Sequence, residues 1–503
     1  MTDRFRIRQL DLLRDPAALL AGALLPLGLS PFDYWTVALL GPACLFWVTW
    51  GATRRFILWR FYLFNVGMFA TGISWIFVSI NVYGGASEFL AGFLVALFVL
   101  LYSLVCLPQA MIYGTWFQSN RLAAAAGFMG LWVLQEWFRG WFLTGFPWLF
   151  LGYSVMETPL ANFAPILGVF GVSLAACACS VFVALVVISR RATPLIPLLA
   201  IVILGYSMGF IEHTRSETSI AVSLVQGNVD QHTKWRADRR VPILNQYLSA
   251  SQSEWGRELV VWPEAAITIF RDNGTRLLSK IDQDLQEVGT TLLTGIPDRN
   301  ESGGFENTVL AVGDGSGQYI KRRLVPFGEY VPLESILRGL IRFFDLPMSR
   351  NTPGPSQQPP LLAGDLRLSV SICYEVVYPD IVRQSTVLAD LLVTVSNDTW
   401  FGSSIGPWQH LQMARMRALE NGRSMVRATN NGVTALIDYQ GRVLDTLPQF
   451  ERGVLRGDVD IRTGTTPFNR FGSLPVLCMS CLLLLAGLRL PRRLKSMHGD
   501  AQG

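Results

Sequence analysis

The chain has 503 residues and a mean hydropathy of +0.34. Half of its residues are hydrophobic and only 16% are charged, compared with about 25% in an average soluble domain. This balance excludes an ordinary soluble protein and predicts a membrane protein. The net charge of +5 does not indicate nucleic-acid binding, because arginine and lysine gather at the ends of apolar runs, where they orient membrane proteins.

Eight apolar runs approach the roughly 20 residues that a helix needs to cross a bilayer. They cover residues 16–32, 34–53, 61–87, 89–113, 122–135, 158–189, 192–211 and 471–488. Seven precede a long polar segment and one follows it. The sequence therefore predicts a polytopic α-helical membrane domain with eight transmembrane helices.

The basic residues predict how this domain is oriented. With the N-terminus in the cytoplasm, the inner segments carry fourteen Arg and Lys, whereas the short outer loops carry only Arg139. This asymmetry follows the positive-inside rule, and it requires an odd number of helices before the polar segment. We expect both termini in the cytoplasm, the polar segment on the other side, and an uncleaved first helix, because the later helices need it to keep their orientation.

The polar segment, residues 212–470, predicts an α/β domain. Runs typical of strands cover residues 219–225, 259–262, 291–296, 366–372, 391–395, 424–428 and 433–437. Runs typical of helices lie between them, at residues 241–255, 276–288 and 408–421. Such alternation indicates a buried sheet covered by helices. We expect three parts: a seven-helix domain (1–211), the α/β domain (212–470), and the eighth helix with its tail (471–503).

Cys373 is the one cysteine in the polar segment, because the other six lie in apolar runs. It directly follows the predicted strand 366–372, so it should lie at a sheet edge, where a pocket can form. A lone thiol in an oxidising compartment is a liability unless it is used. Taken alone, however, a buried core cysteine is the simpler interpretation.

Glu264 and Lys321 favour a catalytic interpretation of Cys373 over a buried core cysteine. Glu264 follows an apolar strand that Pro263 ends, and Lys321 ends another strand. A solvated strand end explains either residue by itself. Together with Cys373 they supply what acyl transfer through a thioester requires: a carboxylate that takes the thiol proton, a thiolate that attacks, and a cation that stabilises the oxyanion.

These residues also carry a family resemblance. The segments around Glu264, Lys321 and Cys373 resemble the Glu-Lys-Cys triad of the nitrilase (carbon-nitrogen hydrolase) superfamily, and residues 396–402 and 420–423 resemble its later motifs. The resemblance implies that the α/β domain is an αββα sandwich. The membrane helices and the strings at 145–148, 324–329 and 404–410 narrow the resemblance to the apolipoprotein N-acyltransferase family of the bacterial inner membrane.

The resemblance implies a two-step reaction. Cys373 attacks the ester of a phospholipid such as phosphatidylethanolamine, and the thioester then passes its acyl chain to the N-terminal amine of a lipidated apolipoprotein. Glu264 serves as the base and Lys321 holds the oxyanion. Trp235, Glu329, Tyr374 and Glu375 match supporting positions. We expect no cofactor and no metal, because the four histidines are scattered, and we expect a monomer with a periplasmic catalytic domain.

Two alternatives stay open. A membrane-anchored amidase or nitrilase would share the triad but would use water as the second acceptor, and eight helices exceed the need of an anchor. A transporter or structural protein with an inactive outer domain is disfavoured, because ion pathways usually need ionisable residues that these apolar runs lack.

Two further features have open interpretations. Residues 333–344 show helical apolar spacing and form either an arm that dips into the membrane interface or a helix that packs on its own domain. Glu136 and Arg139 lie near the outer end of the fifth helix. We favour charges that reach interfacial water over a buried pair that lines a lipid path.

Overall fold

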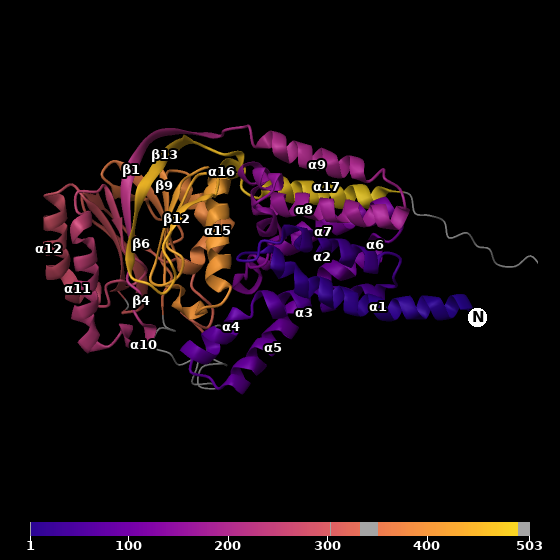
Figure 1. Cartoon of the computed structure of the whole chain (residues 1–503), viewed down its shortest axis with the longest axis horizontal. Helices are drawn as coiled ribbons and strands as arrows, with labels where there is room; N and C mark the ends of the chain where they lie inside the picture. Colours follow the sequence, from indigo (N-terminus) through magenta and orange to yellow (C-terminus); the bar gives the residue numbers. More distant parts are fainter. Residues whose placement is uncertain (1, 302, 332–350, 491–503) are drawn as a thin grey trace, which may run out of the picture.

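A computed structural model describes residues 2–301, 303–331 and 351–490. A helical part and an α/β part lie end to end (Figure 1). The N-terminus lies at the end of the helical part that points away from the α/β part. The segment 333–344, with its predicted arm, lies outside the described residues.

The helical part contains helical structure at each of the eight predicted apolar runs. Its main helices are α1 (Thr2–Leu24), α2 (Trp35–Thr49), α3 (Arg54–Gly72), α4 (Trp75–Val78), α5 (Glu88–Leu104), α6 (Leu107–Trp116), α7 (Arg121–Arg139), α8 (Ala164–Ser189), α9 (Leu195–Met208) and α17 (Leu474–Arg489). The last of these returns from the α/β part and packs beside α7 and α8 (Figure 1).

Length and hydropathy identify only some of these helices as membrane spans. Among the described residues, Glu88–Trp116 and Pro159–Ser189 are long and apolar enough to cross a membrane, and Arg54–Gly72 with Trp75–Tyr83 adds a third if this pair, bent by 52°, is one span. Three more apolar helices are shorter, at Trp35–Thr49, Leu195–Met208 and Leu474–Arg489. The helical part is therefore apolar as predicted, and the number of eight spans stays a prediction.

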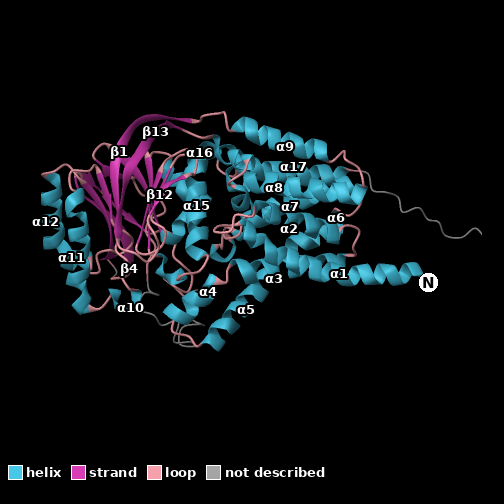
Figure 2. Ribbon diagram, viewed as in Figure 1, coloured by secondary structure: helices cyan, strands magenta, loops and turns pink. Residues whose placement is uncertain are grey.

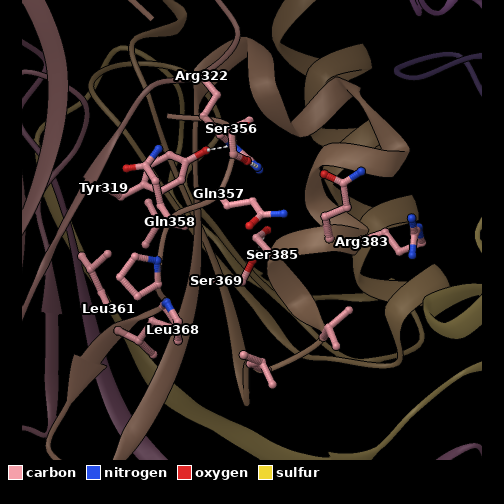
Figure 3. A pocket seen from close by; sticks show the side chains of 16 residues that line it. Tyr319, Arg322, Ser356, Gln357, Gln358, Leu361, Leu368, Ser369, Arg383 and Ser385 are labelled. Carbon is pink, nitrogen blue, oxygen red and sulfur yellow. Dashed lines mark hydrogen bonds between the residues drawn. The ribbon is translucent and has the colours of Figure 1, made fainter. Parts of the chain in front are cut away.

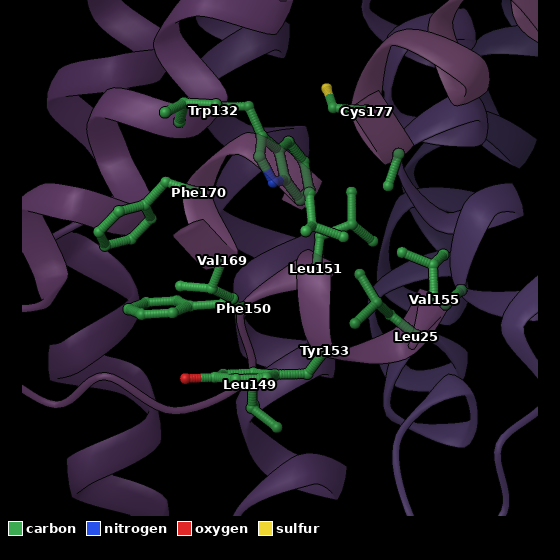
Figure 4. Close-up of a cluster of buried hydrophobic side chains, with 14 of the residues drawn as sticks. Leu25, Trp132, Leu149, Phe150, Leu151, Tyr153, Val155, Val169, Phe170 and Cys177 are labelled. Atoms are coloured by element: carbon green, nitrogen blue, oxygen red, sulfur yellow. The ribbon is translucent and has the colours of Figure 1, made fainter. Parts of the chain in front are cut away.

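Small residues allow the first helices to pack closely. A Cβ atom at Gly22 of α1 would lie 1.9 Å from the carbonyl oxygen of Phe64, and one at Gly67 of α3 would lie 2.2 Å from that of Leu19. Only glycine fits where two helix backbones approach this closely. Beside these helices, larger side chains fill the core, as Figure 4 shows for Leu25, Trp132, Leu149, Phe150, Leu151, Tyr153, Val155, Val169, Phe170 and Cys177.

Two sheets form the centre of the α/β part (Figure 2). The six-stranded sheet has the order β13-β1-β2-β3-β4-β6, with β13 (Gly453–Gly464), β1 (Thr214–Gln226), β2 (Leu259–Val261), β3 (Thr291–Arg299), β4 (Phe305–Gly313) and β6 (Gln318–Ile320). The seven-stranded sheet has the order β12-β11-β10-β9-β8-β7-β5, with β12 (Val443–Thr446), β11 (Ala435–Ile437), β10 (Met425–Thr429), β9 (Leu391–Ser396), β8 (Leu366–Ile372), β7 (Leu361–Ala363) and β5 (Gly315–Ser316).

Apolar residues of both sheets meet in one core, and helices cover the outer faces. Val222 and Val261 from one sheet share this core with Val370 and Val393 from the other. On the outside of the six-stranded sheet lie α11 (Arg240–Ser251) and α12 (Thr275–Gln286), whereas α14 (Pro379–Thr386) and α15 (Gly406–Asn421) cover the seven-stranded sheet. The arrangement is the predicted αββα sandwich.

Helix α15 lies between the sandwich and the helical part and joins them (Figure 1). Its Gln412 Nε2 donates to the carbonyl oxygen of Tyr153 at 3.1 Å. Its Glu420 Oε1 accepts from the backbone N–H of Val169 in α8 at 2.7 Å. Both side chains are buried, so each would lose a satisfied hydrogen bond if the two parts separated.

Candidate active site

The three predicted reactive residues follow the ends of strands from both sheets. Glu264 comes three residues after β2, Lys321 directly follows β6, and Cys373 directly follows β8. Because β2 and β8 belong to different sheets, the sandwich brings the carboxylate and the thiol together across its core. The site is therefore built by the fold and not by neighbouring residues in the chain.

The Glu264 carboxylate is buried and held on both oxygens. Its Oε1 accepts from Asn307 Nδ2 at 2.7 Å, and its Oε2 accepts from the backbone N–H of Asn397 at 2.9 Å. Lys321 Nζ lies 3.4 Å from Oε1. With contacts on both oxygens, the Glu264 side chain is held in a fixed orientation.

Lys321 lies between two carboxylates. Its Nζ is 2.7 Å from Glu329 Oε1 and 3.4 Å from Glu264 Oε1, and its side chain is only 1% exposed. Burial by itself would lower the pKa of Lys321, but the charges of Glu329 and Glu264 outweigh burial and raise that pKa well above its ordinary value. The ammonium is therefore a permanent and oriented cation.

Cys373 has an unusual backbone and a protonated thiol. Its φ is +53°, in the left-handed region that side-chain-bearing residues rarely adopt. The residue is half-buried. Burial, followed by the charge of Glu264, raises the pKa of the Cys373 thiol, and Lys321 opposes that rise. A thiol with a raised pKa needs a base before it can attack, and Glu264 is the adjacent carboxylate.

Glu375 ties the cysteine segment to the lysine segment. Its Oε2 accepts from the backbone N–H of Ile372 at 2.8 Å, and its Oε1 accepts from the backbone N–H groups of Arg322 and Arg323 at 2.6 and 3.1 Å. The Tyr319 hydroxyl lies 3.0 and 3.1 Å from the two oxygens. One buried carboxylate thus fixes the chain directly before Cys373 and directly after Lys321.

Tyr374 connects the site to the helical part. Its hydroxyl donates to the carbonyl oxygen of Gly145 at 3.3 Å, and the Tyr378 hydroxyl lies 3.2 Å from the same oxygen. Arg323 Nη2 donates to the neighbouring carbonyl oxygen of Thr144 at 2.6 Å. The segment that contains the nucleophile therefore rests on the loop after α7.

The relation of Trp235 to the triad is less direct than that of Glu329, Tyr374 and Glu375. It is half-buried at the end of α10 (Gln231–Lys234), and its indole nitrogen is buried without a hydrogen-bond partner among the described residues. The adjacent Lys234 makes the contact instead, because its Nζ donates to the backbone carbonyl oxygen of Glu264 at 3.2 Å. Burial lowers the pKa of Lys234 to about 8.

The sequence did not identify three residues that contact Glu264: Lys234, Asn307 and Asn397. Lys234 and Asn397 lie in or beside segments whose resemblance was noted, so their neighbourhood carried a signal. Asn307 lies within β4, a strand that the sequence did not predict, and no pattern around it indicates the contact.

Glu136 and Arg139 correct one expectation. They are 1% and 2% exposed and lie in the last turn of α7. Glu136 Oε1 accepts from the backbone N–H of Leu151 at 2.8 Å, and Arg139 Nη1 donates to the carbonyl oxygen of Trp148 at 3.2 Å. The interpretation that these charges reach interfacial water is wrong, because both are enclosed by protein, where they hold the loop that carries Trp148.

A cavity of about 450 Å³ lies in the α/β part (Figure 3). Tyr319 and Arg322 line it, and Arg322 Nε donates to the Tyr319 hydroxyl at 3.1 Å. Neither Glu264, Lys321 nor Cys373 contributes to its wall. We assign the site to the triad, because the triad and not this cavity supplies the reactive groups.

Comparison with known proteins finds a family match for each part of the chain. The carbon-nitrogen hydrolase family matches residues 221–467, and the N-terminal domain of apolipoprotein N-acyltransferases matches residues 21–182. Nit3 of Saccharomyces cerevisiae, a nitrilase-superfamily protein, is similar over 49% of this chain and 91% of its own, with 16% identity and a TM-score of 0.38. The family match over residues 221–467 makes the α/β part a domain of the carbon-nitrogen hydrolase class.

Whole-chain relatives narrow the assignment. Apolipoprotein N-acyltransferase of Azotobacter vinelandii is 46% identical over 96% of both chains. The protein of that name from Pseudomonas syringae pv. tomato is 43% identical over 95% of this chain and 96% of its own. The chain belongs to the apolipoprotein N-acyltransferase family.

Proposed function

We propose that this enzyme moves an acyl chain from a membrane phospholipid, of the phosphatidylethanolamine kind, to the N-terminal amine of the lipidated cysteine of apolipoproteins. This is the last step of bacterial lipoprotein maturation. The observation that carries the proposal is the arrangement of Lys321 between Glu264 and Glu329, with the charges of Glu264 and Lys321 both acting on the Cys373 thiol.

In the first step, Glu264 takes the thiol proton and Cys373 Sγ attacks the ester carbonyl of the phospholipid. The carbon–oxygen ester bond breaks, and the proton passes from Glu264 to the departing oxygen, which leaves as a lysophospholipid. The acyl chain stays on Cys373 as a thioester. Covalent catalysis of this kind divides one difficult transfer into two easier ones.

In the second step, the acceptor amine attacks the thioester carbonyl. Glu264 takes a proton from the amine, the carbon–sulfur bond breaks, and the proton returns to the sulfur. The product is an amide, and the enzyme is restored. One base can serve both steps because it is a carboxylate again at the start of each.

Lys321 is suited to stabilise the oxyanion of both steps. It remains charged because its carboxylate neighbours raise its pKa, and Glu329 prevents it from pairing with Glu264 alone. A cation that is held in place before the reaction stabilises developing charge without reorganisation.

Both substrates are anchored in a membrane, so we infer that the site lies at a membrane surface. We propose eight transmembrane helices, a seven-helix domain in residues 1–211, a periplasmic catalytic domain in 212–470, and a closing helix and cytoplasmic tail in 471–503. The placement of the N-terminus away from the α/β part (Figure 1) and the positive-inside pattern support this topology. Tethering a domain to the surface that holds its substrates raises their effective concentration.

Transfer between the two substrates tests the function. The purified protein is incubated with phosphatidylethanolamine that carries a deuterated acyl chain and with a diacylated lipopeptide. We expect a lipopeptide that has gained the labelled chain as an N-terminal amide. Cys373→Ser should abolish the product, whereas Cys481→Ser, which changes an exposed cysteine of α17, should not.

The same assay separates the alternatives. Release of labelled fatty acid without labelled lipopeptide would indicate a hydrolase that uses water. Absence of both products from the wild-type protein would contradict the proposal.

Labelling in intact cells tests the topology. In a cysteine-light background, Gly51→Cys lies in a proposed cytoplasmic loop and Glu301→Cys lies on the exposed surface of the catalytic domain. A membrane-impermeant maleimide that is small enough to reach the periplasm should label position 301 in intact cells and position 51 only after lysis. Labelling of position 51 in intact cells would contradict the orientation.

A further inference from the structure

The left-handed backbone of Cys373 needs a structural cause. Residues with a Cβ atom rarely adopt a positive φ, and they keep it only where their surroundings hold it. At Cys373 the φ of +53° also sets the direction in which the side chain leaves the strand. Whatever holds this backbone therefore determines where the sulfur lies relative to Glu264 and Lys321.

Two hydrogen bonds hold the backbone around Cys373. On the N-terminal side, the N–H of Ile372 donates to Glu375 Oε2 at 2.8 Å. On the C-terminal side, His410 Nε2 lies 3.2 Å from the Cys373 carbonyl oxygen. The first contact comes from the short segment that contains the nucleophile, whereas the second comes from helix α15, far away in the sequence.

Both ring nitrogens of His410 are held by neighbouring groups. A carbonyl oxygen can only accept a hydrogen bond, so Nε2 carries a proton. His410 Nδ1 lies 3.0 Å from Asp398 Oδ1 and 3.1 Å from Arg427 Nη2. Asp398 holds Arg427 in place, with 2.7 Å between Arg427 Nη2 and its Oδ2, and its Oδ1 accepts from the Ser396 hydroxyl at 2.6 Å. Burial and then Arg427 lower the pKa of His410, whereas Asp398 raises it.

The helix that carries His410 is itself fixed. The adjacent Gln409 accepts from Trp148 Nε1 at 2.6 Å and donates to the carbonyl oxygen of Gly72 at 3.2 Å. These partners belong to the helical part, and Gln409, His410 and Trp148 are each about 1% exposed. A side chain in such surroundings has no freedom to move away from Cys373.

We infer that His410 is a positioning residue for the acylation of Cys373, which rests on the proposed function of Cys373 as the acyl carrier. Its Nε2–H holds the Cys373 carbonyl and thereby keeps Cys373 in its left-handed conformation. In a trans peptide, the carbonyl and the following N–H point in opposite directions. The same bond therefore also fixes the direction of the Tyr374 N–H. His410 is not the base, because both of its ring nitrogens are already engaged.

Three variants test this role. His410→Leu removes the donor, His410→Gln keeps an N–H that can reach the Cys373 carbonyl, and Gln412→Leu is the matched control. Gln412 lies on the same helix and is buried. It makes hydrogen bonds to backbone groups of Tyr153 and Ser30 in the helical part and does not contact Cys373. The control therefore measures what the loss of a buried polar contact on α15 does by itself.

Two acyl donors are used for each variant, in single-turnover experiments that give the acylation rate and its dependence on donor concentration. One donor is phosphatidylethanolamine, and the other is a short-chain p-nitrophenyl ester, whose burst of p-nitrophenolate reports acylation without a phospholipid. Misplacement of a reacting atom by about 1 Å can cost about 100-fold in rate. We expect His410→Leu to lose about this much in maximal rate with both donors, at an unchanged half-saturating concentration.

His410→Gln should recover to within about tenfold of the wild-type rate, because it restores one hydrogen bond. Gln412→Leu should keep the wild-type rate even if its melting temperature falls as far as that of His410→Leu. A wild-type rate in folded His410→Leu, no recovery in His410→Gln, or an equal loss of rate in Gln412→Leu would each overturn the positioning role. Failure of wild type with the phospholipid but not with the ester would contradict the proposed donor and leave the His410 comparison intact.

Discussion

The substitution Glu375→Gln tests whether one buried carboxylate holds the two halves of the site together. Glutamine has the same shape but offers one acceptor oxygen in place of two. If that oxygen keeps the bonds from Arg322 and Arg323, the new amide group faces the N–H of Ile372, which is also a donor. The backbone directly before Cys373 is then left without its partner.

The contacts of Glu375 set the size of the effect. A buried donor without a partner costs about 1–3 kcal/mol, and bonds to a neutral oxygen are weaker than bonds to a carboxylate. Against this, burial raises the pKa of Glu375, so replacing the charge recovers some desolvation free energy. We expect a net loss of about 2 kcal/mol, which for a domain of this size lowers the melting temperature by about 4–8 °C.

The rate should fall further than this loss of stability suggests. Both the Cys373 and the Lys321 segments lose their common anchor, and misplacement by about 1 Å can reduce a rate about 100-fold. Calorimetry in detergent gives the stability, and single-turnover acylation well below the melting temperature gives the rate. Glu258→Gln is the control, because Glu258 accepts a backbone N–H from Ala221 at 3.0 Å at an exposed position. Unchanged melting and an unchanged rate in Glu375→Gln would refute the reasoning.

Three further predictions follow from the contacts around the site. Because burial and then Glu264 raise the pKa of the Cys373 thiol while Lys321 lowers it, carbamidomethylation of Cys373 should be slow at pH 7.5 and still rising above pH 9. Peptide mass spectrometry measures this reaction. At fixed pH, Lys321→Met should react more slowly than wild type, and a faster reaction would contradict the shift. Glu329→Gln leaves Lys321 paired with Glu264 alone, so the acylation rate should fall at least tenfold with little change in melting temperature. A wild-type acylation rate would show that Glu329 does not hold Lys321 for catalysis. Gln409→Leu leaves the Trp148 indole and the Gly72 carbonyl without their Gln409 partners, so the free energy of unfolding should fall by about 2–3 kcal/mol. Thermal unfolding measures this loss, with the exposed substitution Gln384→Leu as the control. Equal free energies of unfolding in the two variants would show that Gln409 does not join the two parts.

Much of the fold could be predicted because apolar patterning carries it. The eight apolar runs coincide with helices, and the predicted strands at 259–262, 366–372 and 391–395 coincide with β2, β8 and β9. Strands β2 and β9 are buried along their whole length and are nearly continuous runs of apolar residues, whereas β8 alternates apolar residues with Arg367, Ser369 and Ser371. In contrast, β13 (Gly453–Gly464) lies at the edge of its sheet with charged residues along one face, and its pattern resembles that of a polar loop.

The site, like the fold, could be predicted only in part. Glu264, Lys321 and Cys373 could be selected because they follow strand ends and because their segments carry a family resemblance. Their partners could not all be selected, because contacts across the sandwich join residues that are far apart in the chain, such as Asn307 with Glu264. Glu136 and Arg139 were misinterpreted for a similar reason: a charge near a helix end predicts solvent, and only tertiary structure shows that backbone groups at Trp148 and Leu151 enclose it.

The central claim is that Cys373 carries the acyl chain between the two substrates. The most direct test is the mass of the peptide that contains Cys373 after the protein has met phosphatidylethanolamine with a deuterated acyl chain and no acceptor. The account predicts that this peptide gains the mass of the labelled chain, that hydroxylamine removes it as it removes thioesters, and that a diacylated lipopeptide clears it. An unmodified Cys373 peptide in protein that still produces labelled lipopeptide would contradict the account.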